Sequence, residues 1–130
     1  MPIPTARGRA AFAGLAATLA ALAAAPAPAL AQDAAAGGMA FQQCADCHSA
    51  GDSNGVGPGL KGVVGRRAGT QSGFASSPAL ARSGIAWDAA TLDKFLAAPQ
   101  KLVPGTTMAY AGNDDAKERA DLIAYLQSLK

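Results

Sequence analysis

The chain has 130 residues, of which 50% are hydrophobic and 15% are charged, values that suit one small globular domain. Its formal net charge is +2, from eleven Lys and Arg residues and nine Asp and Glu residues. Two of the basic residues, Arg7 and Arg9, precede every acidic residue, so the chain from residue 32 onward holds nine charges of each sign. This balance argues against nucleic acid as a partner.

The first 31 residues have the features of an export signal. Two arginines and no acidic residue precede a run rich in alanine, and residues 29–31, Ala-Leu-Ala, match the small-x-small pattern of a cleavage site. We expect cleavage after Ala31 and export to the periplasm of a Gram-negative bacterium. Residues 32–130 then remain as a single domain.

Two other interpretations of this N-terminal segment stay open. An uncleaved membrane anchor needs about 20 strongly apolar residues, whereas only the sixteen residues 10–25 run without a proline, and most of them are alanine. A mitochondrial presequence also bears arginine and few acidic residues, but the compact apolar run and the Ala-Leu-Ala end favour export.

Residues 34–44 predict a first helix, and a cysteine-rich motif follows it directly. Cys44-Ala45-Asp46-Cys47-His48 holds both cysteines and the only histidine of the chain, and C-x-x-C-H is typical of c-type haem attachment. On a helical turn the side chains at i and i+3 share a face. Cys44 and Cys47 can therefore both form thioethers on one edge of a single porphyrin, and His48 is then directed at the iron.

Three other chemistries compete for this motif. A structural zinc site needs four ligands, and no second cluster of cysteine or histidine exists. A C-x-x-C redox site is typically found in a βαβ unit, and no alternating strand flanks the motif. A plain disulfide between Cys44 and Cys47 is possible in an exported protein, but it leaves His48 unexplained.

Elimination indicates which residue would be the second iron ligand. Haem iron held by one histidine is either left open or closed by another protein ligand, and without a second histidine a thioether is the leading candidate. Met1 leaves with the export signal, and Met39 lies five residues before the first cysteine, on the segment that carries the motif. Met108 remains, in a loop that follows the turn residues Pro104 and Gly105. A core methionine that fills a gap is the alternative.

Residues 88–99 predict a second helix. Asp88 is a suitable N-terminal cap, apolar residues recur along one face, and Pro99 is a terminator.

Residues 113–130 predict the C-terminal helix. Asn113 and Asp114 are its expected caps, and Asp115 and Arg119 are spaced to pair at i, i+4. No strand of convincing length is present in the sequence. The expected fold is all-α, with three main helices and long loops wrapped around one haem.

From about residue 36 to residue 130 the chain resembles class I cytochromes c, and more narrowly the short exported bacterial cytochromes related to cytochrome c2 and to mitochondrial cytochrome c. The resemblance rests on CADCH, GVGPGLKGVVGRRAG, GIAWDAATLDKFLAAPQKLVPGTTMAYAG and ERADLIAYLQSLK, which occur in that order and at similar spacing.

The resemblance implies roles for seven residues. His48 and Met108 would be the axial ligands, and Cys44 and Cys47 would carry the haem c. The carbonyl of Pro58 would accept a hydrogen bond from the His48 ring. Two further residues, Arg66 and Trp87, match positions whose N–H groups bind a buried haem propionate; their alternatives are a solvated arginine and an ordinary core tryptophan.

A six-coordinate iron has no vacant place for a substrate, so we expect a periplasmic one-electron carrier and not an enzyme. Its partners would be redox proteins, such as a membrane quinol:cytochrome c reductase and a terminal oxidase or other periplasmic oxidoreductase. A monomer is expected, because both cysteines are committed to haem. The enzyme alternative is a small haem peroxidase or gas sensor in which Met108 dissociates.

The sequence also departs from its relatives. Phe95 and Ser76 stand at positions where tyrosine is frequent, and neither can donate a phenolic hydrogen bond. A ring of lysines often surrounds the exposed haem edge in the family. Here Gln42 and Gln43 precede the first cysteine, and Gln100 and Thr107 occupy positions where lysine is common in the family. The remaining candidates for steering are Lys61, Lys94, Lys101 and Lys117.

Overall fold

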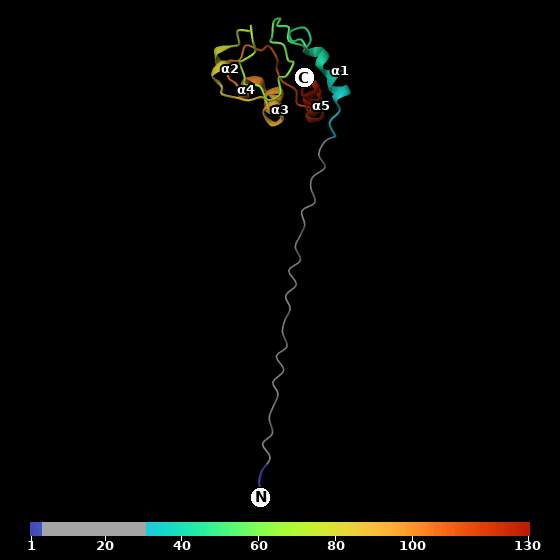
Figure 1. Ribbon diagram of the computed structural model, residues 1–130, viewed down its shortest axis with the longest axis vertical. Coiled ribbons are helices and arrows are strands. Elements are labelled where there is room, and N and C mark those ends of the chain that lie inside the picture. Colours follow the sequence, from blue (N-terminus) through green and yellow to red (C-terminus); the bar gives the residue numbers. More distant parts are fainter. Residues whose placement is uncertain (4–30) are drawn as a thin grey trace.

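The computed structural model describes residues 1–3 and 31–130, so most of the expected export signal lies outside the described residues. The helices are α1 (Ala34–Ala40), the 3-10 helix η1 (Phe41–Gln43), α2 (Pro78–Arg82), α3 (Ala89–Ala97), α4 (Pro99–Leu102) and α5 (Ala116–Ser128) (Figure 1). Within this part of the chain the only β pairing is an isolated bridge between Arg67 and Ala86. The all-α expectation is therefore confirmed. Among the described helices, none has the length and apolar character to cross a membrane.

The first predicted helix is present as α1 followed by η1. Asp33 caps it, because its carboxylate accepts the backbone N–H groups of Ala35 and Ala36 at 2.9 and 3.1 Å, two of the donors that a helix start leaves unpaired. At the other end, η1 carries the chain into Cys44.

The second predicted helix is α3, and Asp88 is its cap as expected. The carboxylate of Asp88 accepts the Thr91 N–H at 2.7 Å, and this hydrogen bond lowers the pKa of the Asp88 carboxyl. Pro99 ends this helix as expected, because α3 stops at Ala97 and Ala98 is its C-cap. Since proline is tolerated at a first helical position, it opens the short helix α4 after a break at Ala98.

The C-terminal helix is present as α5, but its predicted cap and ion pair are wrong. Asp115 is the cap, and its carboxylate accepts the N–H groups of Lys117 and Glu118. That carboxylate is therefore occupied at the helix start, and Arg119 instead pairs with Asp93 of α3 at 2.8 Å. Asn113 supports the cap from outside, because its side-chain oxygen accepts the Asp115 N–H.

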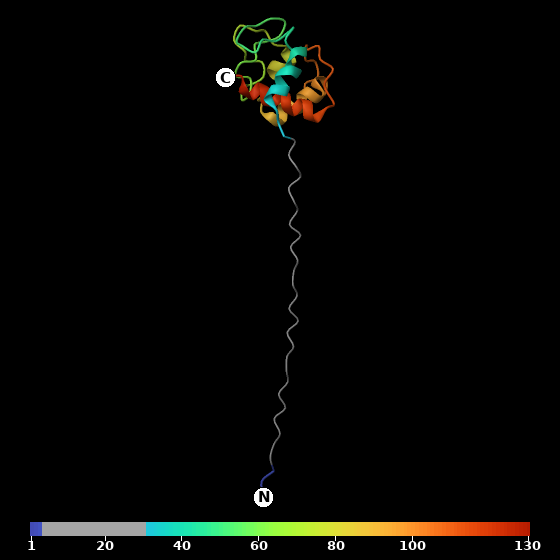
Figure 2. The ribbon, with the colours of Figure 1, turned by 90° about the vertical axis from the view of Figure 1, so that its right-hand side faces the viewer.

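Helices α1 and α5 pack closely against each other. Figure 2 shows them crossing, with α1 in front of α5. A Cβ on Gly37 would lie 1.9 Å from the carbonyl oxygen of Asp121, so only glycine fits there without a shift of backbone. The neighbouring Gly38 is less confined, because its Cβ would meet the Tyr125 ring at 3.4 Å. Phe41 packs on that same ring, with 5.2 Å between the centroids.

A buried carboxylate joins the same two helices. Asp121 is only 6% exposed and accepts the Asp33 N–H at 2.8 Å. Lys117 lies 2.5 and 2.6 Å from its two oxygens. The Lys117 ammonium, followed by the Asp33 N–H, lowers the pKa of the Asp121 carboxyl.

Ordered loops fill the chain between Cys44 and α3. Asn54 ties two of them together, because its side chain donates to the Ser72 carbonyl at 2.9 Å and accepts the Gly59 N–H at 3.0 Å. The Gly62 N–H donates to the Leu129 carbonyl at 2.7 Å and so attaches the loops to the end of α5. Apolar side chains from all these segments form one core: Phe41, Val63, Ala68, Trp87, Leu92, Phe95, Leu96, Val103, Leu122, Ile123 and Leu126.

Replacing Gly37 by alanine tests the crossing of α1 and α5. Because the added methyl group meets backbone, we expect Gly37→Ala to lower the free energy of unfolding by about 1–3 kcal/mol. Gly38→Ala is the matched control, and we expect it to be neutral or stabilising, since alanine exceeds glycine in helix propensity by about 1 kcal/mol. Urea denaturation of both variants measures the difference. Equal stability of the two would contradict the close approach.

Asp121 predicts a pH dependence of stability. A carboxyl whose pKa is lowered in the folded state stabilises the fold above its unfolded pKa, about 3.9 for Asp, and this stabilisation is lost as pH falls through the folded value. We expect Asp121→Asn to have a lower denaturation midpoint than the parent at pH 7 and the difference to shrink at pH 3 and below. The control is Asp114→Asn, whose parent carboxylate makes no hydrogen bond to the described chain. A difference that persists unchanged at low pH would refute the assignment.

Candidate functional site

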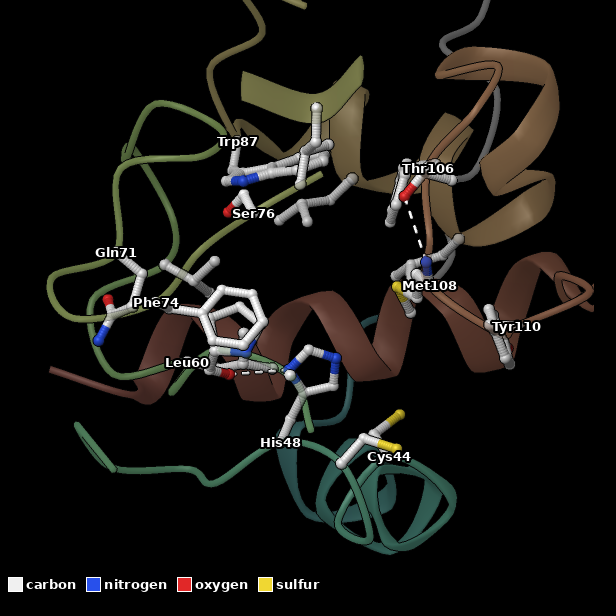
Figure 3. Close-up of a pocket in the computed structure, with 18 of the residues that line it drawn as sticks. Cys44, His48, Leu60, Gln71, Phe74, Ser76, Trp87, Thr106, Met108 and Tyr110 are labelled. Carbon is white, nitrogen blue, oxygen red and sulfur yellow. Dashed lines mark hydrogen bonds between the residues drawn. The ribbon is translucent and has the colours of Figure 1, made fainter. Parts of the chain in front are cut away.

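One cavity of about 260 Å³ lies between the loops and the helices. The C-x-x-C-H motif borders it, α3 and α5 provide apolar walls, and the loop around Met108 closes another part of it (Figure 3). The apolar lining includes Phe41, Leu60, Leu92, Leu96 and Leu126. The cavity is therefore suited to a large apolar group that a few polar side chains hold in place.

The motif forms a helical turn at the cavity. The N–H groups of Cys47 and His48 both donate to the Cys44 carbonyl, at 3.1 and 2.9 Å, and all three side chains line the cavity. Both cysteines are free thiols, which gives the disulfide alternative no support. Burial, followed by nearby Cys47 and Glu118, raises the pKa of the Cys44 thiol.

The His48 ring is oriented by the expected contact with Pro58. Nδ1 lies 2.8 Å from the Pro58 carbonyl oxygen, drawn as a dashed line in Figure 3. A carbonyl oxygen only accepts, so Nδ1 carries a proton, and in the neutral ring Nε2 then has the lone pair that binds a metal. Gly57 leaves room for this ring, because a Cβ there would lie 2.5 Å from the imidazole Cε1.

Met108 reaches the same cavity from a different segment (Figure 3). Its loop begins with a turn in which the Thr106 N–H donates to the Val103 carbonyl at 3.1 Å. Gly105, with φ of +88°, supplies the left-handed conformation that such a turn requires after a proline. Met39 is 72% exposed and does not line the cavity, whereas Met108 does.

Arg66 and Trp87 lie together at the cavity wall. The backbone N–H of Trp87 donates to the backbone carbonyl of Arg66 at 2.9 Å, and both side chains line the cavity. The Arg66 guanidinium donates to the carbonyls of Lys61 and Gly59, at 3.2 and 3.0 Å, and to the side-chain oxygen of Gln71. Burial lowers the pKa of Arg66, against the opposing effect of Asp52.

Trp87 has an unused donor at this wall. It is 7% exposed and packs against Phe95 with 4.9 Å between ring centroids, yet its indole N–H donates to no acceptor within residues 31–130. Ser76 borders the cavity nearby (Figure 3). Within the described chain no fully buried side-chain donor or acceptor lacks a partner, so the indole N–H of Trp87 is accessible and can donate to a group bound in the cavity.

Several lining residues were missed by sequence reasoning, chiefly Gln71, Phe74, Thr106 and Tyr110. Tyr110 could have been found, since in an extended segment residue i+2 shares the face of residue i, and Tyr110 stands two places after Met108. Burial raises the pKa of its hydroxyl. Phe74 and Gln71 carried no such signal, because a long loop brings them to the cavity.

The donor set fits a haem. One imidazole nitrogen and one thioether sulfur enter an apolar cavity whose border holds two free thiols, and iron porphyrins take such ligands. Within the described residues no group of three or more His, Cys, Asp and Glu side chains could hold a metal ion.

Comparison with known proteins agrees with this site. The family profile described as cytochrome c matches residues 34–130. Cytochrome c2 of Blastochloris viridis is 47% identical over 108 residues, which cover 82% of this chain and 85% of that protein. Cytochrome c of Trypanosoma brucei brucei is 54% identical over 80 residues, which cover 62% of this chain and 86% of that protein.

A solved structure shows the same fold. Cytochrome cH from Methylobacterium extorquens is 53% identical, with a TM-score of 0.71, and the match covers 73% of this chain and 97% of that chain. Cys44 and Cys47 stand in the haem-attachment motif that the family shares. The chain therefore belongs to the cytochrome c family, whose members carry covalently bound haem c, and it is an electron-transfer protein and not an enzyme.

Proposed function

We propose that this protein is a periplasmic one-electron carrier in which His48 and Met108 are the axial ligands of a haem attached through Cys44 and Cys47. The observation that carries the proposal is the arrival of an oriented imidazole and a thioether in one apolar cavity bordered by both cysteines. When bound, haem iron supplies a couple that takes up and releases one electron.

The chain holds the imidazole in the form that a metal needs. Pro58 accepts the Nδ1 proton of His48 at 2.8 Å, which fixes the ring orientation and raises the basicity of Nε2. Two protein ligands kept in both oxidation states would leave little rearrangement to accompany electron transfer.

The cavity walls and the methionine favour the reduced state. A thioether ligand and apolar surroundings disfavour an added positive charge and so raise the reduction potential. Phe95 is buried at this wall, 6% exposed, and it has no hydroxyl with which to hydrogen-bond the Met108 sulfur. The sulfur therefore lacks a donor at the position where relatives often have tyrosine.

We further propose that Arg66 and Trp87 bind a propionate of the haem. Their backbones are joined by a hydrogen bond, both line the cavity, and the indole N–H is free to donate. A buried carboxylate needs such donors, and a guanidinium nearby offsets its charge.

For the whole chain we propose residues 1–31 as a cleaved signal peptide and residues 32–130 as the single functional domain, active as a monomer. Cleavage after Ala31 leaves Asp33 near the new N-terminus. Asp33 is needed there, because it caps α1 and its N–H donates to Asp121.

The proposed partners are other redox proteins, such as a membrane quinol:cytochrome c reductase and a terminal oxidase or other periplasmic oxidoreductase. Gln43, Cys47, Val56 and Thr107 line the cavity and are exposed, so they mark where its edge meets solvent. Arg67 also lines the cavity and is exposed, and it is the one charged side chain among the exposed lining residues of the described chain. Docking at this edge would therefore depend little on attraction between opposite charges.

Removal of Met108 tests the proposed ligation. We expect ferric Met108→Ala to lose completely the weak red charge-transfer band of sulfur-bonded iron at neutral pH and to have a lower reduction potential than the parent. Met39→Ala is the matched control, since that methionine is exposed outside the cavity, and it should keep both properties. Optical spectroscopy and a redox titration measure them. A band that survives in Met108→Ala would exclude Met108 as the ligand.

Ionic strength tests the proposed docking edge. We expect the rate of association with an acidic redox partner to change with salt by less than about tenfold, the lower limit of strong electrostatic steering. The double variant Gln43→Lys, Thr107→Lys should associate faster at low salt and show a steeper salt dependence. Gln127→Lys adds a charge on the exposed side of α5, away from the cavity, and should change the rate little. A steep salt dependence of the parent would contradict the proposal.

A further inference from the structure

The loop that carries Met108 starts at a tight turn directly after α4. Val103, Pro104, Gly105 and Thr106 form this turn, closed by the Thr106 N–H to the Val103 carbonyl at 3.1 Å. The turn stands at the surface, since Pro104 and Gly105 are exposed. Water can therefore compete for its backbone groups, and one backbone hydrogen bond alone holds it weakly.

Gln100, on α4, spans this turn with both ends of its side-chain amide. Nε2 donates to the Thr106 carbonyl at 2.7 Å, and Oε1 accepts the Gly105 N–H at 3.2 Å. The orientation of the amide is unambiguous, because a carbonyl can only accept and a backbone N–H can only donate. Although Gln100 is exposed, both polar atoms of its side chain are hydrogen-bonded to this turn.

The amide of Gln100 is linked to Met108 through Thr106. The Thr106 side chain is buried, 5% exposed, and lines the cavity. Its Oγ1 accepts the Met108 N–H at 3.4 Å, drawn as a dashed line in Figure 3. Gln100 thus holds the backbone of the residue whose side chain contacts the backbone of Met108.

The far end of the loop is anchored separately. The Asn113 N–H donates to the Leu96 carbonyl at 2.9 Å, and Arg119 donates to the Asn113 carbonyl at 2.8 Å. A Cβ on Gly112 would lie 2.1 Å from the Ala97 carbonyl oxygen, so the backbone there is packed against the end of α3. For Met108 to leave the cavity, the segment between the two anchors must move.

We propose that Gln100 is a positioning residue that sets how readily Met108 leaves the iron. The inference rests on the proposed function, since it takes Met108 to be a ligand. Gln100 contacts neither the cavity nor Met108 directly, and it acts by holding the turn from which the methionine loop departs. Relatives often have lysine here, and an ammonium group can donate to the Thr106 carbonyl but cannot accept the Gly105 N–H.

Variants of Gln100 in the haem-loaded protein test the proposal. Imidazole is added to the ferric protein, and the rate at saturating imidazole reports release of the methionine. Gln100→Ala removes two hydrogen bonds, so we expect release to become roughly five- to thirtyfold faster. Gln100→Glu keeps the acceptor for the Gly105 N–H, and Gln100→Lys keeps a donor for the Thr106 carbonyl, so both should give intermediate rates.

Hydrogen exchange at one amide supplies a readout that does not depend on iron. The Gly105 N–H should exchange faster in Gln100→Ala and Gln100→Lys, while Gln100→Glu should retain much of its protection. The matched control is Gln127→Ala, an exposed glutamine on α5 that makes no side-chain hydrogen bond to the described chain. Its imidazole rate and its Gly105 exchange should equal those of the parent.

The outcomes separate the two proposals. A parent protein without the sulfur-to-iron charge-transfer band would overturn the ligand assignment, whatever Gln100 does. If the band is present, an unchanged imidazole rate in Gln100→Ala would overturn the positioning role, even with faster exchange at Gly105. The positioning role would also be overturned if the loss in free energy of unfolding of Gln100→Ala, measured by urea denaturation, were as large as its faster imidazole rate corresponds to. The residue would then act only on overall folding.

Discussion

The close contact of α1 with α5 is the constraint on which the site depends. Gly37 brings the two backbones together, and Asp121 of α5 joins them again by accepting the N–H of Asp33, the cap of α1. Since η1 and Cys44 follow α1 without a gap, the position of α1 on α5 decides where the cysteine motif meets the cavity. A small shift at this crossing would therefore displace both thiols and the His48 ring together.

The rest of the cavity is built by loops, and these are held by hydrogen bonds rather than by regular secondary structure. Pro58 orients His48, Asn54 ties two loops, and Gly62 attaches them to the end of α5. A domain of this size buries a modest fraction of its surface, so an apolar group in the cavity would complete the core as well as serve the chemistry.

The two sides of the cavity are secured in different ways. The histidine belongs to a helical turn that is continuous with α1 and is fixed by one short contact with Pro58. The methionine belongs to a loop that is tied at each end, by Gln100 at its start and by Arg119 near its end. The position of Met108, the proposed ligand, thus depends on the hydrogen bonds of an exposed turn, whereas that of His48 depends on a helical turn and the Pro58 carbonyl.

Local patterns in the sequence were enough to predict the three main helices and the cysteine motif, because each depends on residues a few places apart, but they did not predict the short helices α2 and α4. They failed at the start of α5, where Arg119 pairs with Asp93 of α3 and Asp115 is the cap. They also gave no indication that Gln71 and Phe74 line the cavity or that Gln100 spans the turn before Met108. Such contacts join segments that are distant in sequence or folded back on themselves, and only the packing of the chain decides among the partners that each polar group could choose.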